Sequence, residues 1–323
     1  MSWFNFSFPD FAFAFLSVLF EGIPFLLLGA LISGVVDVFV SSERIAKMLP
    51  KNPMGAIGLS GLLGLIFPMC ECGSVIIIRR FIKKGVPLSC ATTYMLAAPI
   101  VSPIVAVSTW QAFSKSDPLL MTSLRLGLGY LLAVGVGLVV QGLPARRIMR
   151  ESTTQPGNQR GSRTGLSTAA APASGNFSEA VGKASVPKRL LMCVQSATAD
   201  FLDVAFFFII GVAVTSVFNT AIRQDVLEPL ATSPLLSIVS LMGLAALLAL
   251  CSTTDAFVAW TFTIFSPQAK LAFLLFGPVF DLKLFWLYGL IFKRRFVVMM
   301  ALGLFVAIAL LCWRIPSELF TTR

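Results

Sequence analysis

The sequence predicts an all-α membrane protein with two homologous halves arranged as an inverted repeat, and about eight apolar segments that include broken or re-entrant helices. Three observations predict it. The chain of 323 residues is 57% hydrophobic and 12% charged, with a mean hydropathy of +0.87, values far from those of a soluble domain. Its apolar segments are long enough, or nearly so, to cross about 30 Å of hydrocarbon. Related motifs also occur in the same order before and after a polar central stretch.

The apolar segments are residues 11–40, 54–69, 88–113, 119–143, 190–218, 234–251, 256–290 and 296–313. We expect all of them to be helical, because lipid does not tolerate unpaired backbone groups. The N-terminal stretch MSWFNFSFPDFAFAF has no basic n-region and no small-residue cleavage site. The first segment is therefore predicted to be a retained helix rather than a signal peptide.

Residues 144–189 separate a first membrane repeat, 1–143, from a second, 190–323. This stretch is rich in Ser, Thr, Gly, Ala and Pro and lacks apolar periodicity, so it is predicted to be a flexible linker. It holds eight basic residues against Glu151 and Glu179. Basic segments beside membrane spans stay on the cytoplasmic side, which explains the charge better than nucleic-acid binding.

Two alignments indicate an internal duplication. FEGIPFLLLGALISGVV from Phe20 aligns with LDVAFFFIIGVAVTSVF from Leu202, which pairs Glu21 with Asp203 and Gly29 with Gly211. A second alignment with a nearly equal offset pairs Cys72 with Cys251, Ser74 with Thr253, Pro99 with Pro278, and Ser102 with Asp281. Two alignments with nearly the same separation in residue number favour an internal repeat.

The placement of cations predicts how the halves are oriented. Basic residues cluster at Arg44–Lys51, at Arg79–Lys84, in the linker and at Lys293–Arg295, and we expect all of them to be cytoplasmic. For the first two clusters to share a side, residues 54–78 must enter and return as a re-entrant hairpin. Counting membrane crossings in the same way through the second half makes 234–265 a hairpin that enters from the outer side. The two halves are then inverted relative to each other, as in many secondary transporters. The alternative is eight ordinary spans in two parallel halves.

The stretch FPMCECGSVIIIRRFIKKG, residues 67–85, is predicted to form the first broken site. Pro68 would end one short helix, residues 69–73 would form an unwound tip, and the next helix would start near Ser74 as its N-cap. Cys70 and Cys72 could then hold one soft, thiophilic centre beside Glu71, whereas on a regular helix they would point about 200° apart. Alternatively these cysteines are small apolar residues, as we expect of Cys90, Cys193 and Cys312. The chain has no histidine and no paired C-x-x-C, so we predict no metal site and no cofactor.

Further polar residues interrupt the second half and the end of the first. LCSTTDAF, residues 250–257, supplies Cys251, Thr253, Thr254 and Asp255 as a second polar tip, with simple N-capping as the alternative. Prolines break two other apolar stretches, where Ser102, Asp281 and Lys283 are expected to lie near Pro99 and Pro278. A plain proline kink is the alternative.

Four carboxylates are candidates for proton coupling: Glu21, Glu71, Asp203 and Asp255. An ionisable group inside an apolar run is expensive and marks a substrate or proton route. Alternatively Asp200 and Asp203 lie at a helix end among the lipid headgroups. The basic run Arg79, Arg80, Lys83 and Lys84 forms one helix face, which we interpret as a headgroup anchor, with a gate or anion funnel as the alternative.

The strings IPFLLLGALISG, FPMCECGSV, RRFIKKGVPL, LAAPIVSPIV, LCSTTDAFVA and LLFGPVFDLKL together resemble the bacterial predicted permeases whose named branch is the ArsP-type organoarsenical efflux permeases. The similarity covers both halves and excludes the linker. It implies an inner-membrane permease rather than an enzyme, and in the named branch an exporter of trivalent organoarsenicals. Trivalent arsenic is thiophilic, so Cys70, Cys72 and Cys251 are the expected contacts.

The mechanistic hypothesis is proton-coupled alternating access, with membrane lipids and a small solute as the partners. The chain has no phosphate-binding loop, so neither ATP hydrolysis nor nucleic-acid binding is expected. Two rivals remain open: a membrane thiol oxidoreductase that uses Cys70 and Cys72, and an ion transporter based on the carboxylates.

Overall fold

The computed structural model describes residues 8–39, 50, 52–67, 69–149, 186–221 and 233–320. Within these ranges the regular structure is helical and no strand forms, which confirms the predicted all-α class. The helices are α1 (Phe8–Phe39), α3 (Pro53–Ile66), α4 (Glu71–Lys83), α5 (Leu88–Ala97), α6 (Pro103–Ala112), α7 (Pro118–Gln141), α8 (Ala145–Ile148), α10 (Val186–Ala221), α11 (Pro234–Leu248), α12 (Asp255–Thr261), α13 (Pro267–Phe276), α14 (Leu282–Tyr288), α15 (Arg294–Arg314) and the 3₁₀-helix η3 (Ser317–Phe320).

In the described part of the chain, four helices are long and apolar enough to cross a membrane: α1, α7, α10 and α15. Large apolar side chains on them, such as Phe13, Leu131 and Leu302, are exposed rather than packed against protein. A surface of this kind is stable in contact with lipid. The chain is therefore a multi-pass membrane protein.

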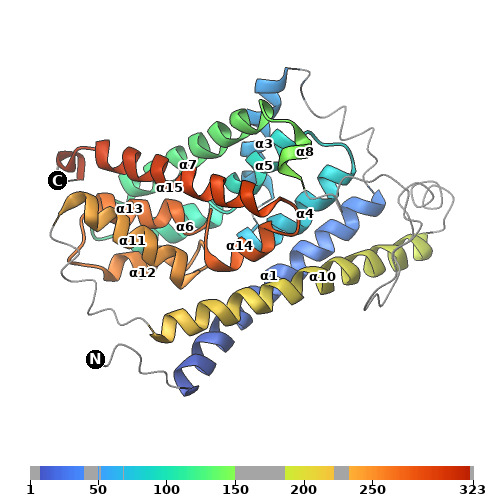
Figure 1. The fold of residues 1–323 in the computed structure, drawn as a ribbon, viewed down its shortest axis with the longest axis horizontal. Helices are drawn as coiled ribbons and strands as arrows, with labels where there is room; N and C mark the ends of the chain where they lie inside the picture. The colour runs from blue at the N-terminus through green and yellow to red at the C-terminus, as the bar shows by residue number, and fades with distance from the viewer. Residues whose placement is uncertain are drawn as a thin grey trace.

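The long helices run in opposite directions in the two halves of the chain (Figure 1). In that view α1 and α7 run from left to right, whereas α10 and α15 run from right to left. Helices α1 and α10 pack side by side along much of their length, so they form an antiparallel pair.

The other helices are too short to span hydrocarbon alone. The 14 residues of α3 extend about 21 Å, and α5 and α11 are similarly short. The predicted segment 88–113 is divided into α5 and α6, and 256–290 into α12, α13 and α14. Proline favours these boundaries: Pro103 and Pro267 each occupy the first turn of a helix, where a missing N–H is harmless.

Each predicted hairpin consists of two helices separated by a break. The first break, residues 67–70, lies between α3 and α4, and the second, residues 249–254, lies between α11 and α12. The helix after the first break begins at Glu71, not near Ser74 as predicted. Cys70 is its N-cap, with Sγ accepting a hydrogen bond from the Gly73 N–H at 3.4 Å, and Ser74 instead donates to the Glu71 carbonyl. The predicted helix end at Pro68 lies outside the described residues.

Two basic clusters meet at one end of the molecule. The Lys293 N–H donates to the Ile148 carbonyl at 2.9 Å, and its Nζ donates to the Arg146 carbonyl at 2.7 Å. The C-terminal end of α4 lies at this same end (Figure 1). The predicted cluster at Arg44, Lys47 and Lys51, and residues 150–185 of the predicted linker, lie outside the described residues.

Candidate functional site

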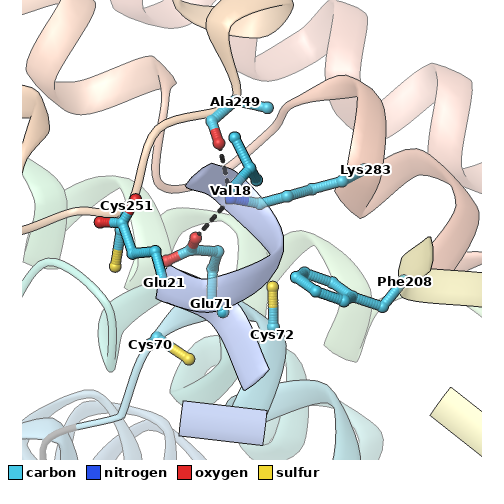
Figure 2. A pocket seen from close by; sticks show the side chains of 10 residues that line it. Val18, Glu21, Cys70, Glu71, Cys72, Phe208, Ala249, Cys251 and Lys283 are labelled. Atoms are coloured by element: carbon cyan, nitrogen blue, oxygen red, sulfur yellow. Dashed lines mark hydrogen bonds and ion pairs between the residues drawn. The ribbon is translucent and has the colours of Figure 1, made fainter. Parts of the chain in front are cut away.

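The two breaks meet at a small pocket lined by residues from both halves of the chain (Figure 2). The lining residues come from α1, from α4 and its cap, from α10, from the second break and from α14: Val18, Glu21, Gly22, Cys70, Glu71, Cys72, Phe208, Ala249, Cys251 and Lys283. Helices α1 and α4 approach closely here, because a Cβ added at Gly29 would lie only 2.8 Å from the Gly73 Cα.

Lys283 joins the two breaks. Its side chain is only 4% exposed, and its Nζ lies 2.9 Å from Glu71 Oε1 and 2.8 Å from the Ala249 carbonyl, to which it donates. Asp281 Oδ2 lies 3.4 Å away. The hydrogen bond to Ala249 and the ion pairs with Glu71 and Asp281 hold the ammonium in place.

Glu71 occupies a position that suits a carboxylate. It is the first residue of α4, where the positive end of the helix stabilises negative charge. Its Oε1 pairs with Lys283, but its buried Oε2 accepts no hydrogen bond from the described residues. Asp281 caps α14 by accepting from the Leu284 N–H at 2.6 Å. Two buried carboxylates therefore share the one ammonium of Lys283.

The six cysteines are all buried and form no disulfide, and they divide into two groups by whether they line the pocket. Cys70, Cys72 and Cys251 line the pocket, and the Cys72 thiol lies beside that of Cys70. The other three pack in separate apolar clusters: Cys90, Cys193 and Cys312. The described residues contain no group of three or more Cys, Asp or Glu side chains arranged to hold a metal ion. Cys70, Cys72 and Cys251 also belong to an apolar core cluster, so only their place in the pocket lining distinguishes them from the other three.

Glu21 reaches the pocket, whereas its aligned partner Asp203 does not. Glu21 Oε1 accepts a hydrogen bond from the Thr254 hydroxyl at 3.0 Å, which links α1 to the second break. The Asp203 side chain is 64% exposed and lies 3.5 Å from Arg79 Nη2. The two aligned carboxylates therefore have different surroundings, and only Glu21 faces the thiols.

Asp255 lies behind the second break in a buried ion pair. Arg125 Nη2 lies 2.7 Å from Asp255 Oδ2, and it also donates to the Ser252 carbonyl at 2.9 Å. Arg125 Nη1 donates to the Thr109 hydroxyl at 2.8 Å. The sequence analysis missed Arg125, although a single cation in the middle of the apolar run 119–143 was the signal that could have revealed it.

The other predicted site residues do not line the pocket. Ser102 is the N-cap of α6, with its hydroxyl accepting from the Val105 N–H. Pro99 and Pro278 lie in the turns that end α5 and α13, and Thr253 lies half-buried in the second break. Ser74 acts on the site indirectly, through its bond to the Glu71 carbonyl.

The predicted basic face contributes to the interior of the bundle. Arg80 Nε lies 2.8 Å from Asp200 Oδ2, and the Ser33 hydroxyl donates to the same oxygen at 2.8 Å. Asp200 is buried, whereas Asp203 is exposed, and Arg80 binds protein through its ion pair with Asp200. This network joins α1, α4 and α10.

The chain is similar to known proteins over most of its length. Residues 8–315 match the ArsP-type family that is described as "Predicted permease". The chain is 33% identical over 287 residues to "UPF0718 protein YcgR" of Bacillus subtilis, covering 88% of this chain and 90% of that protein. It is 32% identical over 285 residues to a Streptococcus mutans protein named "Putative two-component membrane permease complex subunit", covering 88% and 87%. No solved structure matches the chain. From the match over most of its length, the chain belongs to the ArsP-type predicted permease family.

Proposed function

We propose that this permease exports a small thiophilic solute, such as a trivalent organoarsenical, by proton-coupled secondary transport across the bacterial inner membrane. One observation carries the proposal. Three thiols and a carboxylate, one oxygen of which accepts no hydrogen bond from the described residues, line one pocket between segments from both halves of a membrane protein. Polar groups buried at this depth are expensive, so a substrate route is the physical reason to keep them there.

The thiols would supply affinity without preventing release. Trivalent arsenic binds soft sulfur ligands, and Cys70, Cys72 and Cys251 are the three thiols of the pocket. They lie on two different segments, the start of α4 and the second break, so relative movement of these segments would change how many thiols reach the solute. A lower number of sulfur ligands favours release.

The charge balance of the pocket supports proton coupling. Among the described residues that line the pocket, Lys283 is the only cation. It pairs with Glu71 and Asp281, Glu21 lines the same pocket, and Asp255 is balanced separately by Arg125. An excess of carboxylates over cations in a low-dielectric site favours proton uptake. We assign the exchangeable protons to Glu21 and Glu71. Asp203 pairs with Arg79 outside the pocket. It would exchange protons only at the end of the molecule where the basic clusters lie.

The inverted repeat is part of this proposal, with 1–143 and 190–323 as its units. The opposite directions of α1 and α10, and of α7 and α15, support it (Figure 1). The aligned residues Ser102 and Asp281 are both N-caps, and α3 packs on α5 and α7 as α11 packs on α13 and α15. The two breaks would then be the tips of hairpins 54–78 and 234–265, and the basic end would be cytoplasmic.

Transport by everted inner-membrane vesicles tests the function. Vesicles from cells that express the protein should accumulate methylarsenite above vesicles with the empty vector, and a protonophore should abolish the difference. Equal uptake by both vesicles would remove the arsenical proposal. Uptake that resists the protonophore would remove the proton coupling but leave the permease.

A further inference from the structure

The polar groups of the pocket are held in place by one another and by the breaks. Lys283 pairs with Glu71 and donates to the Ala249 carbonyl. Glu21 accepts a hydrogen bond from Thr254. Moving any of these groups would break an ion pair or a hydrogen bond, and a buried polar group left without its partner costs free energy. The polar wall is therefore the wall least able to yield to a solute.

Phe208 of α10 forms an apolar wall of the same pocket. It is the only aromatic residue among the described residues that line the pocket, and it is 1% exposed. Figure 2 shows its ring pointing into the pocket, toward the side where the Cys72 thiol lies. The end of the ring abuts Gly22 of α1, because a Cβ added at Gly22 would overlap it. Only packing holds the ring, so it can move without breaking a hydrogen bond.

The pocket is too small for a solute unless a wall gives way. The space in it that is open to water is about 10 Å³, roughly one water molecule. A solute that binds Cys70 or Cys72 must place its remaining substituents against a neighbouring wall. A hydrocarbon substituent set against Glu71 and Lys283 would disturb their ion pair, whereas one set against Phe208 gains apolar contact.

We infer that Phe208 is a specificity-determining residue, which sets the size of the hydrocarbon group that a thiol-binding solute can carry into the pocket. The inference rests on the proposed function and adds the side chain that contacts the substituent of the solute. A smaller side chain at this position would enlarge the pocket on the side of the thiols, so bulkier groups would reach them. Small thiol-binding compounds would gain little, because they need less room.

Variants of Phe208 test this size limit. Phe208→Ala removes the ring, and Phe208→Leu removes part of it, in case the alanine variant does not fold. Phe273→Ala is the matched control, because Phe273 of α13 is also 1% exposed but does not line the pocket. The probes are two uncharged thiol reagents, methyl methanethiosulfonate and its benzyl analogue. Each forms a mixed disulfide with a cysteine and releases methanesulfinate, while the thiol proton goes to water.

The measured quantity is the ratio of benzyl to methyl labelling rates at Cys70 and Cys72, resolved by mass spectrometry on the purified full-length protein in detergent. Phe208→Ala should raise this ratio at least about tenfold above the wild type. Phe208→Leu should raise it less, and Phe273→Ala should leave it unchanged. An unchanged ratio in the folded Phe208 variants, or an equal rise in Phe273→Ala, would overturn the inference.

The wild type alone provides a second test. Its benzyl-to-methyl ratio should be at least about tenfold lower in the folded protein than after denaturation. Equal ratios would overturn the inference, because the pocket would then impose no size limit. Labelling does not require transport. Expected labelling ratios without methylarsenite uptake would therefore count against the proposed function alone.

Discussion

Arg125 of α7 donates to both carboxylate oxygens of Asp255, at 2.9 and 2.7 Å, and so ties the first half of the chain to the start of α12. Neither side chain is more than 2% exposed. The guanidinium also binds the Ser252 carbonyl, which belongs to the second break. This pair therefore fixes the segment that presents Cys251 to the pocket.

Removing Asp255 should destabilise the protein strongly. Asp255→Ala leaves Arg125 buried without its counter-charge, and breaking such a pair costs about 3–5 kcal/mol. We expect a clear fall in the thermal unfolding temperature of the purified protein in detergent. Lys115→Gln, at an exposed position before α7, is the control and should unfold like the wild type. An unchanged unfolding temperature for Asp255→Ala would contradict the role of the pair.

Asp200 and Asp203, three residues apart on α10, should differ in their contribution to stability. Asp200→Asn weakens a buried ion pair with Arg80 and the bond from Ser33, so we expect a loss of about 1.5–3 kcal/mol. Asp203→Asn removes a 3.5 Å contact at an exposed carboxylate, which is expected to contribute less than about 1 kcal/mol. Unfolding in detergent measures both. Equal losses would show that the network around Asp200 is not a specific link.

Gly29 should not tolerate even alanine. A Cβ there would lie 2.8 Å from the Gly73 Cα, a backbone atom that cannot move without shifting α1 from α4 beside the pocket. Gly29→Ala should lower both vesicle uptake and the unfolding temperature. Gly135→Ala in α7 is the matched control, since nothing lies within 4 Å of its added Cβ and alanine favours a helix by about 1 kcal/mol. A tolerated Gly29→Ala would mean that the close approach is not required.

Ala249 is left-handed, with a φ of 48°, and its carbonyl accepts from Lys283. Gly adopts this conformation freely, so Ala249→Gly should keep the unfolding temperature within a few degrees of the wild type. A β-branched side chain is strongly disfavoured there, so Ala249→Val should lower it and weaken the second break. If Val is tolerated as well as Gly, the turn does not depend on this backbone conformation.

Local sequence signals predicted the helices and most of the pocket, because these depend on features that neighbouring residues carry. Apolar length marked the helical segments, and Pro99 and Pro278, which were expected to break two apolar stretches, lie in the turns that end α5 and α13. The Cys-Glu-Cys string and the LCSTTDAF stretch identified residues from both breaks.

The errors concern one local helix cap and several partners that lie far away in the sequence. Ser74 is a better N-cap by residue preference, but the helix starts one turn earlier, where Cys70 accepts the capping hydrogen bond. The alignment made Glu21 and Asp203 equivalent, whereas Thr254 and Arg79 give them different surroundings. Residue type and spacing do not determine which distant group meets a side chain, so the Arg125–Asp255 pair also stayed hidden.

The central claim is that the pocket thiols carry the solute, and uptake of methylarsenite by everted vesicles from cysteine variants tests it most directly. Cys70→Ser/Cys72→Ser should reduce uptake to the level of the empty vector while the protein still folds. Cys90→Ser/Cys312→Ser, which changes two buried cysteines outside the pocket, should retain it. Full transport by Cys70→Ser/Cys72→Ser would contradict the account and favour a carboxylate-based route.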